Sequence, residues 1–69
     1  MIIDFEIGSL VVLISGRNNV YRVTKIDEST DDVEITRYVD GEPRWMNVKC
    51  WEVRLATKDE CKNGCRSKI

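Results

Sequence analysis

The chain has no histidine, and none of its apolar runs is longer than the five residues 10–14. Without histidine, the commonest general acid and base of enzymes is missing. A five-residue run is far shorter than the about 20 apolar residues that a membrane-spanning helix needs. The first residues carry acids where a secretory signal peptide needs a basic segment. The sequence therefore predicts a cytoplasmic protein that does not bind to a membrane.

An excess of charge of one sign is also lacking, because eleven basic and twelve acidic residues leave a net charge of −1. This balance lacks the basic footprint that is typical of nucleic-acid-binding domains. The three cysteines are an odd number, whereas a disulfide framework needs pairs. Cys61 and Cys65 have a spacing that zinc sites allow, but the third weak candidate, Cys50, stands alone. We therefore expect free thiols, no metal and no cofactor.

No group of residues in the sequence forms a recognisable active site. A cysteine nucleophile without a histidine base needs another way to form its thiolate, and nothing near the three cysteines supplies one. The neighbouring carboxylates Asp31 and Asp32 lie in a predicted loop, without an apolar pocket that would raise a pKa. The sequence therefore predicts that the protein is not an enzyme.

What the sequence does contain is short β-branched segments separated by glycines and acidic loops, the pattern of an all-β domain. The second segment loses its alternation at Ile26, which predicts a β-bulge near Thr24 or Lys25. We expect a small five-stranded barrel over residues 1–56 and a polar, mobile tail over residues 57–69, with at most one loose helical turn. The predicted strands are residues 10–14, 20–26, 33–39, 44–48 and 53–56.

Residues 33–48 predict a hairpin whose two faces differ in character. The alternation of a strand places Tyr38 and Trp45 together on the outer face. Arg37 and Arg44 then lie at the rim of the inner face, near the turn. Four apolar side chains point inward to the core: Val33, Ile35, Met46 and Val48.

The length of the hairpin loop has two solutions. A two-residue turn at Asp40 and Gly41 sets Arg37 directly opposite Arg44, which is an unfavourable pairing of like charges. A four-residue loop over residues 40–43 avoids this pairing and places Tyr38 opposite Trp45. We therefore expect the four-residue loop, and the two faces of the hairpin are the same with either loop.

The order of strand, glycine loop, strand, acidic loop, hairpin, tight turn and closing strand resembles an SH3-like barrel. Several short motifs lie within this order: Ile7-Gly8-Ser9-Leu10-Val11-Val12-Leu13, Ser15-Gly16, Val23-Thr24, Tyr38-Val39-Asp40-Gly41 and the ending Val48 to Val53-Arg54-Leu55. Together these motifs resemble the YodC-like family of small bacterial and phage proteins and, more distantly, KOW and Tudor modules. The resemblance covers roughly residues 5–56 and implies no catalytic residues. The chain departs from the family at Gly16-Arg17-Asn18, where Gly-Gly-Pro is usual, and at Tyr38-Val39, where two aromatic residues are usual.

The candidate binding residues are aromatic residues and arginines, the types enriched at binding hot spots. For Trp51 we expect a structural role, plugging the bottom of the barrel before a closing strand in which Val53 and Leu55 point inward. The full candidate set is Tyr38, Trp45 and Trp51 with Arg37, Arg44 and Arg54.

The function expected from this set is a small, non-catalytic protein-interaction module. Its size and the family resemblance suggest a phage-encoded modulator or inhibitor of a host protein, acting in the host cytoplasm. Nucleic-acid binding by a KOW- or Tudor-like barrel, with aromatic stacking and arginine–phosphate contacts, is an alternative that the net charge of −1 disfavours. A zinc-stabilised minidomain is a second alternative. The sequence leaves the oligomeric state open.

Overall fold

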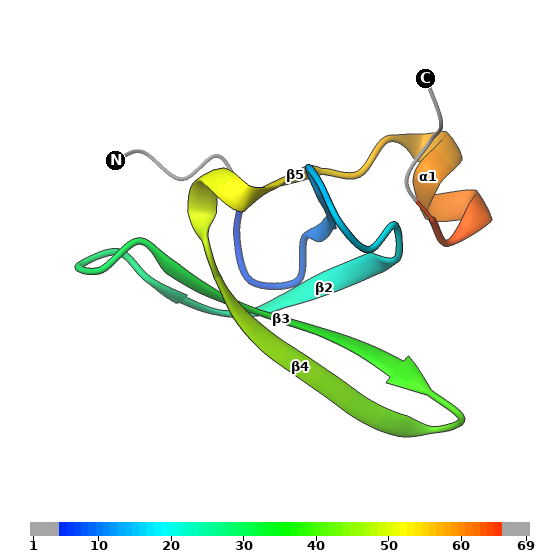
Figure 1. Cartoon of the computed structure of the whole chain (residues 1–69), viewed down its shortest axis with the longest axis horizontal. Coiled ribbons are helices and arrows are strands. Elements are labelled where there is room, and N and C mark those ends of the chain that lie inside the picture. Colours follow the sequence, from blue (N-terminus) through cyan, green and yellow to red (C-terminus); the bar gives the residue numbers. More distant parts are fainter. Residues whose placement is uncertain (1–4, 66–69) are drawn as a thin grey trace.

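The computed structural model describes residues 5–65, which form five strands and a short C-terminal helix (Figure 1). Residues 1–4 and 66–69, the outer ends of the predicted domain and of the predicted tail, lie outside the described residues. The elements are β1 (Leu10–Leu13), β2 (Val20–Asp27), β3 (Asp32–Val39), β4 (Glu42–Lys49), the 3₁₀ turn η1 (Cys50–Glu52), β5 (Val53–Leu55) and α1 (Lys58–Asn63).

The five strands form one antiparallel sheet in the order β4-β3-β2-β1-β5. Its two edge strands, β4 and β5, are joined by the three residues of η1, so the sheet curls back on itself (Figure 1). This short connection between distant edges gives the arrangement of an SH3-like barrel. The five-stranded all-β fold predicted from the sequence is confirmed.

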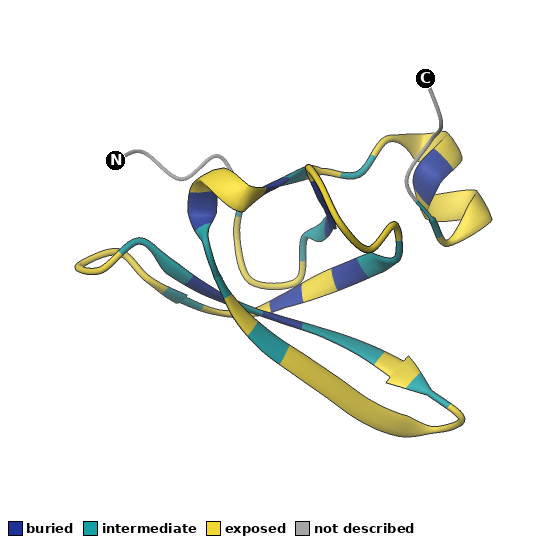
Figure 2. Cartoon of the chain, viewed as in Figure 1, coloured by how far each residue is buried: buried dark blue, intermediate teal, exposed yellow. Residues whose placement is uncertain are grey.

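The core lies inside the curl of the sheet and is built from buried residues of β1, β2, β3, η1 and β5, with partly buried residues of β4 packed against them (Figure 2). β1 buries Val11, Val12 and Leu13 in succession, as expected for a strand that is covered on both faces. β2 instead alternates, and its pairing with β3 shifts by one residue between Val23 and Lys25. The bulge predicted near Thr24 or Lys25 is therefore confirmed.

The four hairpin side chains predicted to point inward do so. Val33 and Ile35 are fully buried, and Met46 and Val48 are partly buried against the same core. The rungs of the ladder pair Val33 with Val48 and Ile35 with Met46. The hairpin thus closes the core with its inner face and leaves its outer face uncovered.

The predicted four-residue loop is wrong. The β3–β4 ladder continues to Val39 opposite Glu42, so the turn consists of Asp40 and Gly41 alone. Both residues have positive φ, 52° and 80°, which is the backbone that a type I′ hairpin turn requires and that Asp-Gly adopts readily. Turn chemistry therefore outweighs the like-charge pairing that the register creates between the two hairpin arginines.

The prediction that Trp51 plugs the barrel bottom is also wrong. Trp51 remains 52% exposed, and Cys50 is the buried residue of η1. The reason is parity: Met46 and Val48 point inward, and the same alternation continues to Cys50, so that its neighbour Trp51 turns outward. On the closing strand Val53 is buried as expected, whereas Leu55, at the end of this edge strand, is 49% exposed.

Where the sequence predicted a tail with at most one loose turn, the structure has the capped helix α1. The Thr57 hydroxyl accepts a hydrogen bond from the Glu60 amide (3.2 Å), and the Glu60 carboxylate accepts one from the Thr57 amide (2.9 Å). Gly64 ends the helix in the left-handed conformation. The Val20 amide donates to the Gly64 carbonyl (3.2 Å), so the helix end is tied to the start of β2.

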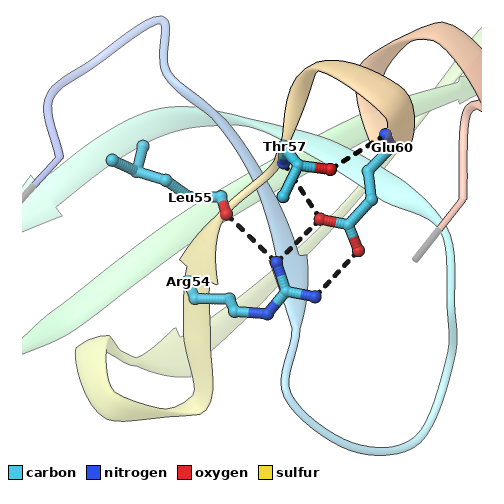
Figure 3. A network of polar contacts seen from close by, with 4 residues as sticks. All are labelled: Arg54, Leu55, Thr57 and Glu60. Carbon is cyan, nitrogen blue, oxygen red and sulfur yellow. Dashed lines mark hydrogen bonds and ion pairs between the residues drawn. The ribbon is translucent and has the colours of Figure 1, made fainter. Parts of the chain in front are cut away.

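The side chain that fixes α1 to the sheet is Glu60, which is fully buried. Arg54 of β5 donates two hydrogen bonds to its carboxylate, at 2.7 and 2.8 Å, and a third to the carbonyl of Leu55 at 3.2 Å (Figure 3). Such a two-pronged arginine–carboxylate contact fixes both direction and distance. The folded domain therefore extends beyond residue 56 to include α1.

Candidate functional site

The outer face of the β3–β4 hairpin carries the two aromatic residues predicted to bind a partner. The register places Tyr38 opposite Pro43 and Trp45 opposite Thr36, so the two rings belong to neighbouring rungs on one face. Tyr38 is 72% exposed and Trp45 is 65% exposed. The half of the hairpin nearest its turn extends away from the rest of the molecule, with its β4 strand exposed and its β3 strand partly buried (Figures 1 and 2). The structure therefore brings Tyr38 and Trp45 together on an open surface.

Polar contacts behind the aromatic pair hold β2 and β3 in register. The Thr24 hydroxyl lies 3.0 Å from that of Thr36 and donates to the Glu34 carboxylate at 2.8 Å. On the same face, the guanidinium group of Arg22 donates to the carbonyl of Gly8 at 3.1 Å. These bonds stabilise the pairing of β2 with β3 and the start of β2 beside the aromatic residues, so Tyr38 lies on a strand that is held in place.

A hollow of about 370 Å³ lies beside Tyr38 on this outer face. Asn19 and Val20, at the start of β2, and Gly64, which ends α1, also line it, so the end of α1 forms part of its wall. Within the part of the chain that the structure describes, two arginines and no carboxylate line it. The lining residues are Leu10, Asn19, Val20, Tyr21, Arg22, Thr24, Thr36, Arg37, Tyr38 and Gly64.

Arg37 and Arg44 occupy neighbouring places on the inner face of the hairpin, as the rungs of the ladder require. They border a second hollow together with Arg17, from the loop between β1 and β2, and the buried Tyr21. Sequence reasoning missed both of these residues. The opposition of Arg37 and Arg44 was visible in the sequence, but it was used there as an argument for the four-residue loop and not as a sign of a shared site.

Trp51 and Arg54 lie outside the two hairpin surfaces. Trp51 is in η1, at the opposite end of β4 from the hairpin turn, and Arg54 is in β5 at the other edge of the sheet. The pKa of the Arg54 guanidinium is raised, chiefly because it donates hydrogen bonds to the Glu60 carboxylate. The structure thus separates these two residues from Tyr38 and Trp45 and gives Arg54 a contact inside the fold.

The acidic loop between β2 and β3 is organised by its own hydrogen bonds. The Asp27 carboxylate accepts from the hydroxyl and amide of Ser29, at 2.6 and 3.0 Å, and these bonds lower the pKa of Asp27. Lys49 lies 2.9 Å from Asp32 and lowers the pKa of Asp32 through this hydrogen bond. These carboxylates therefore stabilise the loop and its attachment to β4.

The three cysteines do not come together. Cys50 belongs to the core, Cys61 is exposed on α1 and Cys65 is half-buried after it, and none of the three forms a disulfide. Within residues 5–65, no group of three cysteine, aspartate or glutamate side chains has an arrangement that could hold a metal ion. The same part of the chain contains no helix with the length and apolar character needed to cross a membrane.

No family model, curated protein or solved structure matches the chain. The function must therefore be inferred from the geometry of the two hairpin faces.

Proposed function

We propose that the protein is a small, non-catalytic interaction module that docks a partner protein on the outer face of the β3–β4 hairpin. The observation that carries this proposal is the shared exposure of Tyr38 and Trp45, at 72% and 65%. The chain has only two tyrosines, two tryptophans and one phenylalanine, so two of its few aromatic side chains lie in water on one surface. Large, stiff aromatic side chains are the residues that dominate binding energy at protein interfaces.

The hollow beside Tyr38 indicates the chemistry of the partner. Its lining contains Arg22 and Arg37 and no acidic side chain, although the chain as a whole is slightly acidic. An acidic side chain of the partner would meet favourable charge there, while an apolar one would cover Tyr38 and Trp45. We therefore infer that the partner presents an apolar surface bordered by acidic residues.

A modulator or inhibitor of a host protein, encoded by a phage, is the specific form of this proposal. Its support is the short chain and the resemblance of its motifs to the YodC-like family of bacterial and phage proteins. In that form the module acts in the host cytoplasm and catalyses no reaction. Its effect would come from covering a surface of the host protein.

The proposal is tested by capture of the partner with matched variants. The immobilised protein is exposed to a lysate of the native host, and bound proteins are quantified by mass spectrometry for the wild type, for Tyr38→Ala with Trp45→Ala, and for Trp51→Ala. Trp51 is the matched control because it is a half-exposed tryptophan at the other end of β4. We expect the double variant to lose the partner that both other proteins retain.

A titration with labelled DNA and RNA at low salt tests the alternative function. If the protein docks a partner protein, it should bind DNA and RNA weakly, because its net charge of −1 gives little attraction to phosphate backbones. Tight binding that weakens steeply with salt would instead make the chain a nucleic-acid-binding barrel and would overturn the proposal.

A further inference from the structure

The inner face of the hairpin carries a cationic hollow distinct from the aromatic surface. It has a volume of about 340 Å³, and its apolar part includes Met46. Arg37 and Arg44 face each other across β3 and β4, and Arg17 approaches from the loop between β1 and β2. Segments far apart in the sequence thus place three guanidinium groups around one space. We call this space the arginine hollow; Tyr21, Pro43 and Trp45 complete its lining.

Tyr21 provides an independent sign that this space takes a ligand. The residue is 3% exposed, and its hydroxyl group is buried without a hydrogen-bond partner among the described residues. Arg22 pairs with Thr36, so alternation puts Tyr21 beside Arg37 on the inner face. A buried hydroxyl without a partner is costly, and native structures seldom leave one unsatisfied. An acceptor brought into the hollow would satisfy it.

The charges around the hollow are also unbalanced. Glu42 lies 3.4 Å from Arg44 and is the one carboxylate paired with these arginines within residues 5–65. Among the described residues, three arginines and one paired carboxylate leave two positive charges. Opposed arginines repel each other, and a counter-ion between them would turn this repulsion into attraction. The pairing that the sequence argued against is therefore explained if the hollow binds an anion.

We propose that the arginine hollow binds a tetrahedral oxyanion with two negative charges, of the phosphate monoester class. Arginine forks match phosphate oxygens with paired N–H groups, and the charge of a dianion equals the local excess. Arg37 and Arg44 hold the anion from β3 and β4, Arg17 closes over it from its loop, and the Tyr21 hydroxyl donates to one oxygen. The phosphate comes either from a phosphorylated side chain of a protein or from free phosphate. The site opens on the opposite face from Tyr38, although Arg37 and Trp45, which line it, also belong to the proposed docking surface and its hollow.

Calorimetric titration and thermal unfolding test the site with inorganic phosphate, sulfate and a phosphoserine peptide, at constant ionic strength set with sodium chloride. The variants are Tyr21→Phe, Arg37→Ala and, as the control, Lys58→Ala, which removes an exposed positive charge that lines neither hollow. We expect Tyr21→Phe and Arg37→Ala each to weaken anion binding about tenfold, as befits a lost hydrogen bond to a charged group. Lys58→Ala should leave the affinity within about twofold, because at this ionic strength a charge outside the site is screened.

Tyr21→Phe also separates a ligand-binding role from a structural one. It removes a hydroxyl that bonds to no described residue, so without anion the melting temperature should be unchanged or higher. With phosphate, the variant should gain less stability than the wild type. Equal binding of phosphate and of a phosphoserine peptide assigns the site to free phosphate, and preference for the peptide assigns it to a phosphorylated protein. If phosphate and sulfate stabilise no more than chloride, or if Lys58→Ala weakens binding as much as Arg37→Ala, the proposal is wrong.

Discussion

At the residue scale, the most consequential side chain outside the hairpin is the buried carboxylate of Glu60. It is fully enclosed, and Arg54 donates to both of its oxygens. A buried charge that loses its partner is strongly destabilising, whereas removal of both partners can cost much less. The pair thus locks α1 to β5 and explains why a polar C-terminal segment folds onto an all-β domain.

Replacement of Arg54 by alanine should therefore destabilise the protein, although by less than in a fully enclosed pair because the arginine is partly exposed. Adding Glu60→Gln should recover part of this loss, since glutamine removes the charge that Arg54 balanced and can still accept from the Thr57 amide. Urea unfolding of both variants measures the two effects. If the double variant is less stable than Arg54→Ala, the Glu60 carboxylate stabilises the protein even without Arg54, and the ion-pair explanation is wrong.

A second residue-scale prediction concerns pH. The hydrogen bond from Lys49 lowers the pKa of Asp32 below its ordinary value of 3.8. A carboxylate with a lower pKa in the folded state stabilises that state above the unfolded value, and this stabilisation disappears as the pH falls through the folded value. Asp32→Asn should therefore be less stable than the wild type at pH 7, and the difference in stability should shrink as the pH falls below 3.8.

Urea midpoints of the two proteins between pH 2 and pH 7 measure this difference. Its disappearance should occur below about pH 4, near the ordinary pKa of aspartate. A gap between the proteins that stays constant down to pH 2 would mean that the Lys49 contact does not act through the charge of Asp32.

Residue-scale prediction from the sequence succeeded where strand alternation decides and failed where a turn intervenes. Val33 and Ile35 are buried and Tyr38 and Trp45 exposed, as a period of two requires. For Trp51, the size of the side chain was given more weight than the parity that carries Cys50 into the core. Tyr21 and Arg17 line the same hollow because of the path of the loop between β1 and β2, and the alternation of the sequence does not predict that path.

At the element scale, the hairpin turn shows how local backbone chemistry prevails over an unfavourable side-chain pair. Asp40 and Gly41 both have positive φ, and glycine adopts this conformation without the strain that a Cβ atom causes. The opposition of Arg37 and Arg44 costs less, because both lie near solvent and Glu42 lies beside one of them. Both the Asp-Gly pair and the opposed arginines are visible in the sequence, and the prediction of a longer loop gave too much weight to the arginines.

Gly41→Ala should accordingly destabilise the protein by about 1–2 kcal/mol, because alanine is strained at a φ of 80°. The space around Gly41 is open, so the effect isolates the backbone from packing. Asp40→Asn is the matched control and should be nearly neutral, since asparagine also adopts positive φ. Thermal unfolding compares the two variants. Equal stability of Gly41→Ala and the wild type would contradict the type I′ turn.

The helix α1 could have been predicted from its termini. Thr57 and Glu60 have the spacing of a capping box, and Gly64 follows where a helix often ends. What the sequence could not show is that Glu60 also meets Arg54, because that contact depends on where β5 ends in space. The polar composition of the segment therefore suggested a tail, although its polar residues form the cap and the ion pair.

At the scale of the whole molecule, the hairpin β3–β4 has two faces that suit two kinds of contact. Its outer face presents Tyr38 and Trp45 to solvent, and its inner face continues from the core to the arginine hollow. The curled sheet and the pinned helix leave the half of the hairpin next to its turn projecting from the domain (Figure 1). A protein of 69 residues can therefore offer a partner an aromatic surface while its core stays closed.

The most direct test of the central claim is the dissociation constant of the purified protein–partner complex. We expect Trp45→Ala to raise this constant about thirtyfold or more, as loss of a buried tryptophan hot spot does. Trp51→Ala should leave it within about twofold, because this tryptophan lies at the other end of β4. Circular dichroism should show both variants folded, since both side chains are largely exposed in the structure. Equal constants for the wild type and Trp45→Ala would contradict the assignment of the outer hairpin face as the docking surface.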